Sequence, residues 1–163
     1  MNLKSISHAS IARALKLAER YRLLGEPDQA ASICRDVLAV DSDHQEATQM
    51  LLLALTDQFG RRTSPSIAEV EGIAAALHSP YEQAYYRGIG YERWARAQLQ
   101  SHTPDYHAGE WLRRAMDCYE QAEAIRPEGD DAALLRWNAC VRLMERVPTL
   151  RSESEAHEHH LGD

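Results

Sequence analysis

Residues 115–127 have the sequence AMDCYEQAEAIRP, in which the small residues Ala115 and Ala122 are 7 positions apart and Pro127 follows 5 positions later. Two further segments repeat these intervals: Ala30, Val37 and Ser42, and Ala68, Ala75 and Pro80. Seven residues make two helical turns, so each pair of small side chains lies on one face of a helix. We therefore expect a neighbouring helix to cross closely at each pair.

The rest of the chain is also typical of helices. Gly and Pro are scarce, 8 and 6 residues, and fall between segments with helical periodicity. No stretch of five residues alternates apolar and polar side chains with β-branched enrichment, so strands are not expected. Ser64 and Ser79 are predicted N-caps, each followed by proline. We expect seven helices. One lies on each side of the break at residues 25–27, and the other five lie over about 42–59, 65–77, 80–102, 105–125 and 130–146.

The repeated intervals resemble the tetratricopeptide repeat, a helix–turn–helix unit of about 34 residues. The matching residues are Leu17, Tyr21, Gly25, Ala30 and Leu38 in the first unit, and Tyr86, Ile89, Gly90, Ala115, Tyr119, Ala122 and Pro127 in the third. The resemblance covers about residues 11–141. It implies an all-α fold, a right-handed α-solenoid of about three helix hairpins with a C-terminal capping helix, which makes seven helices in all.

The middle unit departs most from the repeat. Ala30 and Ala68 are 38 residues apart and Ala68 and Ala115 are 47 apart, both longer than one repeat. Gly72 stands where a bulky residue is expected, and Arg93 where an aromatic one is expected. We predict a helical repeat domain over residues 1–147 and a flexible polar tail, rich in His and Glu, over residues 148–163.

Composition excludes several classes of function. The chain has 18 basic and 25 acidic residues, and its net charge of −7 argues against binding to nucleic acid or to an anionic membrane. The longest apolar run, residues 50–55, is far below the ~18 residues that a membrane span needs. The odd number of cysteines, 3, implies no closed disulfide framework, so a cytoplasmic location is expected.

Catalytic motifs are absent from the sequence. It has no Gly-rich phosphate loop, no G-x-S-x-G and no H-E-x-x-H, so we expect no enzyme, no catalytic residue and no cofactor. Gly88 and Gly90 lie within a helical pattern without a preceding strand, which favours close helix packing over nucleotide binding. The three cysteines lie on apolar faces without C-x-x-C spacing, which favours buried, inert thiols.

The resemblance also implies where a partner binds, because the first helix of each hairpin in such repeats lines a concave groove for a peptide or a helix. The residues that occupy these positions are Leu15, Glu19, Arg22, Leu23, Gln49, Leu53, Thr56, Asp57, Arg87, Tyr91 and Trp94. This mixture suits a partner protein segment with apolar anchors and some acidic character. The favoured function is a non-enzymatic protein–protein interaction module, such as an adaptor, scaffold or assembly factor.

Two alternatives stay open. The C-terminal histidines His157, His159 and His160 could bind a transition metal, which would make the protein a metal- or cofactor-handling factor. No rigid set of supporting residues accompanies them, so a metal site is not the favoured interpretation. The second alternative is a structural protein that associates with itself to form a homo-oligomer, through the groove or through the long third hairpin.

Overall fold

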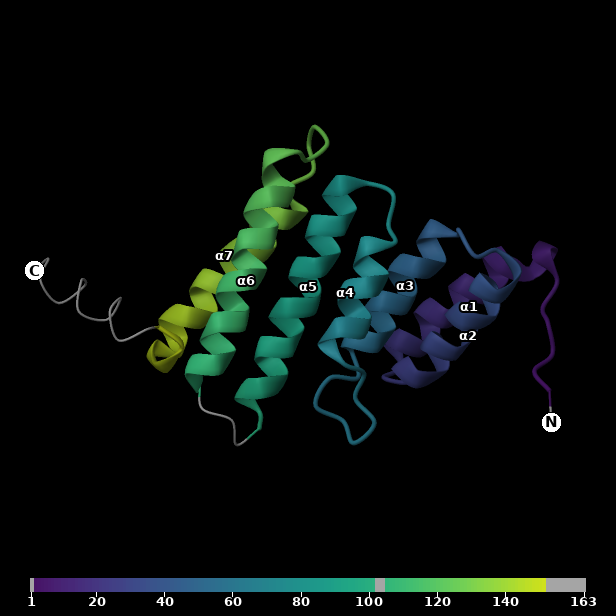
Figure 1. The fold of residues 1–163 in the computed structure, drawn as a ribbon, viewed down its shortest axis with the longest axis horizontal. Coiled ribbons are helices and arrows are strands. Elements are labelled where there is room, and N and C mark those ends of the chain that lie inside the picture. Colours follow the sequence, from purple (N-terminus) through teal and green to yellow (C-terminus); the bar gives the residue numbers. More distant parts are fainter. Residues whose placement is uncertain (1, 102–104, 152–163) are drawn as a thin grey trace, which may run out of the picture. The chain divides into compact units, whose positions relative to one another are not determined.

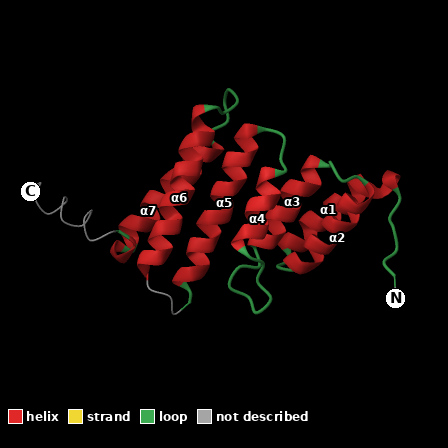
Figure 2. Cartoon of the chain, viewed as in Figure 1, coloured by secondary structure: helices red, strands yellow, loops and turns green. Residues whose placement is uncertain are grey.

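The computed structural model describes residues 2–101 and 105–151, and all the regular structure in these ranges is helical (Figures 1 and 2). The all-α class predicted from the sequence is therefore confirmed for this part of the chain. Its α-helices are α1 Ile11–Leu23, α2 Pro27–Val40, α3 Gln45–Thr56, α4 Ile67–Ala75, α5 Pro80–Leu99, α6 Asp105–Ala124 and α7 Ala132–Arg146, with short 3₁₀ helices at His8–Ser10 (η1) and Pro148–Leu150 (η2). The chain forms two compact units, Met1–Ser79 and Pro80–Asp163, and each is described by itself.

Helices α3 and α4 begin later than the sequence predicts, as does α7, which begins at Ala132 rather than near residue 130. Helix α3 begins at Gln45 rather than near Ser42, since the His44 ring nitrogen Nδ1 accepts a hydrogen bond from the Ala47 N–H at 3.3 Å. Helix α4 begins at Ile67, since Ser66 Oγ accepts from the Glu69 N–H at 3.1 Å. The prediction of Ser64 as the N-cap was therefore wrong. Helices α3 and α4 each start where a side chain can accept from one of the N–H groups that the first turn leaves unpaired.

In unit 1, α1 packs on α2, α2 on α3, and α3 on α4. Gly25 ends α1 with a φ of +78°, a left-handed conformation that glycine adopts without a steric penalty. The Gly25 and Glu26 N–H groups donate to the Arg22 and Tyr21 carbonyls at 3.0 and 2.9 Å, which is the Schellman arrangement of a helix C-terminus. Pro27 then starts α2 immediately. This tight turn makes α1 and α2 an antiparallel hairpin.

The repeated small residues are buried in the first hairpin but not in the middle one. Ala30 and Val37 of α2 are both 0% exposed, as expected for a close helix crossing. Ala68 and Ala75 of α4 are exposed, so that expectation was wrong there. The buried residues of α4 are instead Val70 and Ala74. Burying valine removes more apolar area from water than burying alanine, so hydrophobic area sets the orientation of α4.

In unit 2, α5 and α6 run antiparallel along most of their length, and α7 packs on α6 (Figure 1). Ala115 and Ala122 of α6 are both 0% exposed, which confirms the close crossing predicted for them. After α7, η2 returns the chain to α6, where Leu150 is 0% exposed and its carbonyl accepts from Arg113 Nη1 at 3.2 Å. Pro148–Leu150 is thus packed into the unit, and the predicted flexible tail does not begin at residue 148.

Gly88 of α5 makes room for the ring of Tyr119 on α6. A Cβ atom at Gly88 would lie 2.6 Å from Tyr119 Cε1 and 2.8 Å from Cδ1. The close helix packing predicted for this glycine is therefore confirmed. Tyr119 is 0% exposed, and its hydroxyl donates to Glu92 Oε2 at 2.7 Å, one helical turn beyond Gly88. Burial, followed by the charge of Glu92, raises the pKa of the Tyr119 hydroxyl, so this group stays protonated and donates.

Glu92 joins the three helices of unit 2. Its side chain is 2% exposed, and two guanidinium groups accompany the Tyr119 hydroxyl around it. Arg96 of α5 donates to Glu92 Oε1 from Nε at 3.1 Å and from Nη2 at 3.0 Å. Arg136 of α7 donates to Glu92 Oε2 from Nη1 at 3.2 Å. A buried carboxylate is costly unless it is paired and hydrogen-bonded, and here both oxygens are.

The Gly88→Ala substitution should destabilise the protein by about 1–3 kcal/mol, because the new methyl group must displace the Tyr119 ring. The free energy of unfolding in urea would measure this change. Gly72→Ala is the matched control: Gly72 lies within α4, and a Cβ there would have nothing within 4 Å. That variant should gain about 0.5–1 kcal/mol from the higher helix propensity of alanine. Equal stability of the two variants would contradict the close packing at Gly88.

The Glu92→Gln substitution should cost about 1.5–3 kcal/mol, because Arg96 and Arg136 lose the charge that they bind. Glu128→Gln is the control, since Glu128 is exposed and lies in the loop before α7. Its effect should stay within about 0.5 kcal/mol. Thermal or urea unfolding compares the two variants, and a Glu92→Gln protein as stable as the control would contradict a structural role for the pair.

Candidate functional site

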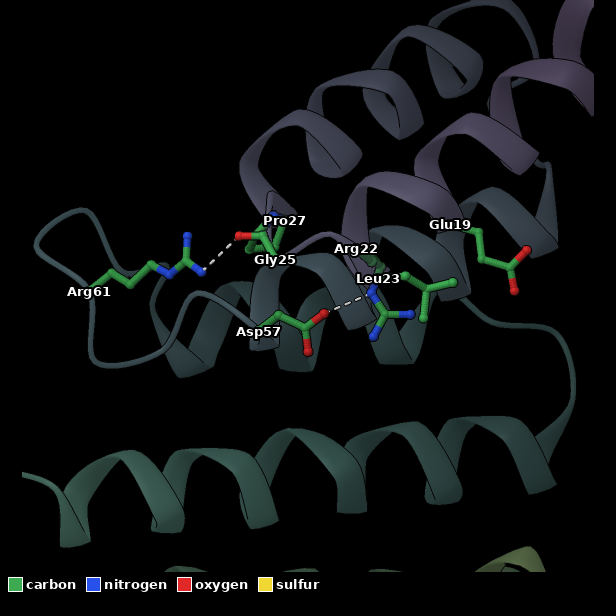
Figure 3. Close-up of a pocket in the computed structure, with 7 residues that line it drawn as sticks. All are labelled: Glu19, Arg22, Leu23, Gly25, Pro27, Asp57 and Arg61. Carbon is green, nitrogen blue, oxygen red and sulfur yellow. Dashed lines mark hydrogen bonds and ion pairs between the residues drawn. The ribbon is translucent and has the colours of Figure 1, made fainter.

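A pocket of about 390 Å³ lies in unit 1 at the end of the first hairpin (Figure 3). It is formed by the last turns of α1, the turn into α2, the C-terminal end of α3 and the loop that follows α3. The residues that line it are Glu19, Arg22, Leu23, Gly25, Pro27, Asp57 and Arg61. We call it the unit 1 pocket.

An ion pair between two helices forms one wall of this pocket. Arg22 Nε of α1 donates to Asp57 Oδ2, at the end of α3, over 2.7 Å. Both side chains are partly exposed, 19% for Arg22 and 27% for Asp57. Arg22 Nη1 also lies 3.9 Å from the sulfur of Met50. These contacts hold the partly exposed guanidinium in place, and they join α1 to α3.

The turn between α1 and α2 forms the opposite wall. Arg61 Nη2 donates to the Gly25 carbonyl at 3.4 Å, which brings the loop after α3 to this turn (Figure 3). Beside it, the buried Gln58 side chain donates to the Ala54 carbonyl at 3.0 Å and to the Pro27 carbonyl at 3.4 Å. Gln58 therefore fixes the end of α3 against the start of α2, and with it the position of Asp57.

The lining is balanced in charge and carries an apolar residue. Arg22 and Arg61 oppose Glu19 and Asp57, so a ligand meets both donors and acceptors. Leu23 is 84% exposed, which leaves a large apolar side chain in water beside these charges. No Ser, Thr, Cys or His lines the pocket, so the nucleophiles and the imidazole base most used in covalent catalysis are missing from this part of the described structure. The arrangement suits non-covalent binding of a segment with both apolar and charged groups.

The unit 1 residues predicted for the groove fall into three sets. Glu19, Arg22, Leu23 and Asp57 line the unit 1 pocket. Gln49 and Leu53 of α3 are half-buried and outside that lining. Leu15 and Thr56 are each only 3% exposed, and Thr56 Oγ1 donates to the Leu53 carbonyl at 3.0 Å. These last two side chains support the helices from within and offer almost no surface to a partner.

The three groove residues predicted in unit 2 lie on α5. Arg87, Tyr91 and Trp94 are all half-buried. The Tyr91 ring lies 5.4 Å from the ring of Trp111 on α6, at an angle of 48°. The Arg114 guanidinium lies 4.6 Å from the Trp111 ring centre, within the range of a cation–π contact. Tyr91 thus contributes to the packing of α5 on α6 as well as to the surface.

Three residues of the unit 1 pocket were not predicted as site residues. Gly25 was interpreted as a helix breaker and as a residue of the repeat, and Pro27 as a helix breaker, although the turn that they form builds one wall. Arg61 falls between the predicted helices 42–59 and 65–77 and was given no role, although it donates to that turn. The signal that could have identified Arg61 is its positive charge directly after Gly60, the glycine that follows α3.

The cysteines have the surroundings expected of inert thiols. Cys34 and Cys140 are 0% exposed and Cys118 is 6% exposed. Burial raises the pKa of the Cys34 thiol to about 11 and, together with the charge of Glu92, the pKa of the Cys140 thiol to about 12. A thiol with a raised pKa is a poor nucleophile at neutral pH, because the thiolate is the reactive form.

Within residues 2–101 and 105–151, no three His, Cys, Asp or Glu side chains gather in a way that could hold a metal ion. The predicted metal candidates His157, His159 and His160 lie outside the described residues. None of the helices in the described ranges combines the length and the apolar character that crossing a membrane requires.

Comparison of the chain with protein-family models, with curated proteins and with solved structures finds no match.

The burial of the thiols predicts their reactivity. In the folded protein at pH 8, Ellman's reagent should modify none of the 3 cysteines within minutes, because burial both blocks access and suppresses the thiolate. In guanidinium chloride all three should react at once. Absorbance of the released thiolate follows both reactions, and fast modification of a thiol in the folded protein would contradict the burial of these side chains.

Proposed function

We propose that this protein is a non-enzymatic protein–protein interaction module, an adaptor, scaffold or assembly factor that acts in the cytoplasm. In this proposal the helices stack as about three repeats of the tetratricopeptide type, capped by α7, and the first helices of the hairpins present the binding surface. Support comes from the α1–α2 and α5–α6 antiparallel hairpins and from the burial of Ala30, Val37, Ala115 and Ala122 at the close crossings that such repeats need.

The observation that carries the proposal is the unit 1 pocket with Leu23 at its edge. A leucine that is 84% exposed costs free energy in water, and binding a partner's apolar side chain would recover it. Arg22 and Asp57 supply a charged donor and acceptor held in fixed positions by their 2.7 Å contact. Fixed polar groups around an apolar anchor are what a binding site for a short peptide or a helix end requires.

The exposed pair Leu23 and Leu24 provides a sharp test. Leu23 lines the pocket, whereas Leu24 is 65% exposed and does not. Peptides selected against the intact chain from a random-sequence display library would serve as the ligand, and fluorescence anisotropy would measure their affinity. Leu23→Ser should weaken binding by about tenfold to a hundredfold, because a buried leucine contributes about 1.5–3 kcal/mol, and Leu24→Ser should change it little.

Two results would count against this proposal. One is a library that yields no binding peptide for the intact chain. The other is a set of peptides whose affinities respond equally to Leu23→Ser and Leu24→Ser, which would place the contact outside the unit 1 pocket. Both leucines are exposed, so helicity measured by circular dichroism should be the same for the parent and both variants.

A further inference from the structure

A second pocket, of about 430 Å³, lies within unit 2 between α5 and α7. Its lining residues are Arg96 from α5 and Ala139, Arg142, Glu145 and Arg146 from α7. We call it the arginine pocket. Arg142 and Arg146 are four residues apart, so their side chains extend from the same face of α7. Three guanidinium groups from two helices therefore meet one carboxylate in this pocket, and it shares no residue with the unit 1 pocket.

The positive charge of this pocket is unusual for the chain that carries it. The protein has 25 acidic residues and a net charge of −7. Among the described residues, however, no carboxylate lies within 4.0 Å of the Arg142 or the Arg146 guanidinium. The polar contact of Arg146 is with a neutral group, since its Nε donates to the Arg142 carbonyl at 3.3 Å. Both side chains thus bring positive charge that the described part of the chain does not neutralise.

Arg96, on α5, is held in position by Glu92 of the same helix. Its Nε and Nη2 donate to the buried Glu92 Oε1, while its side chain remains 40% exposed. Arginine has five N–H donors, so the contact with one carboxylate oxygen leaves donors for a ligand. A guanidinium whose orientation is already fixed loses less conformational entropy when it binds an anion.

We propose that the arginine pocket binds an acidic peptide segment of a partner protein through its carboxylate groups. Arginine matches carboxylate geometry with paired, charge-assisted hydrogen bonds. The guanidiniums of Arg142 and Arg146 originate one helical turn apart, and Arg96 stands on the facing helix, so carboxylates spaced along an extended chain can each meet a separate arginine. Ala139 leaves room between them because its side chain is a single methyl group.

The test uses the full chain and a fluorescein-labelled hexaglutamate peptide, with hexaglutamine as the uncharged control peptide. Fluorescence anisotropy should show that hexaglutamate binds and that hexaglutamine does not. The binding of hexaglutamate should weaken as NaCl rises from about 50 to about 300 mM, because salt screens the exposed charges. The double variant R142Q/R146Q should bind hexaglutamate about tenfold to a hundredfold more weakly, because it removes charge-assisted hydrogen bonds.

The matched control is R13Q/R20Q, which removes the same charge from exposed positions of α1. Its affinity for hexaglutamate should differ from that of the parent by less than about twofold. Arg142 and Arg146 are exposed, so R142Q/R146Q should keep the helicity and the unfolding midpoint of the parent.

Three results would overturn the proposal. The first is no measurable binding of hexaglutamate to the parent chain. The second is an equal loss of affinity in R142Q/R146Q and R13Q/R20Q, which would show a response to net charge alone. The third is inorganic phosphate that binds more tightly than hexaglutamate and loses its affinity in R142Q/R146Q, which would assign the pocket to a free phosphate group instead of a peptide.

Discussion

The hydrogen bonds of Glu92 join the three helices of unit 2, and the packing of Tyr119 against Gly88 makes one of them possible. A carboxylate that is 2% exposed requires partners for both of its oxygens, and α5, α6 and α7 each contribute one through Arg96, Tyr119 and Arg136. Tyr119 can reach Glu92 only because Gly88 has no side chain in the path of its ring. This contact sets the register of α6 against α5, since a shift of α6 along α5 would take the Tyr119 hydroxyl away from Glu92 Oε2.

Unit 1 is held together differently. Its buried residues are mainly small or aliphatic, and Gln58 is one of the few buried polar side chains among its described residues. Gln58 donates to carbonyls at the end of α3 and at the start of α2, so it joins the two ends that border the unit 1 pocket. Asp57 is its neighbour in sequence and points into the pocket (Figure 3). A buried amide that hydrogen-bonds to the backbone thus fixes the position of a partly exposed carboxylate at the pocket.

The sequence predicted most of the helices because the residues that end and start them act locally. Gly25 and Pro27 favour particular backbone conformations whatever packs around them. The sequence analysis failed where tertiary packing decides which face of a helix is buried. The regular interval of Ala68 and Ala75 predicted the buried face of α4, but burial of Val70 removes more apolar area and turns those alanines outward. Leu15 and Thr56 were placed on the groove by position in the repeat, although both lie in the core. The contact of Arg22 with Asp57 joins residues 35 positions apart and has no local signal.

The two pockets differ in what a ligand must bring. The unit 1 pocket sets two arginines against two carboxylates, so its electrostatic field is short-ranged, and in the proposed function its selectivity would depend on geometry and on Leu23. The arginine pocket sets three arginines against one glutamate, on a chain whose net charge of −7 repels acidic ligands at long range. At physiological salt this repulsion is screened beyond about 8 Å, whereas direct contacts with guanidinium groups are screened less. Acidic segments would therefore be selected by contact rather than by attraction from a distance, which favours a slow association rate and makes affinity depend on how many carboxylates reach an arginine.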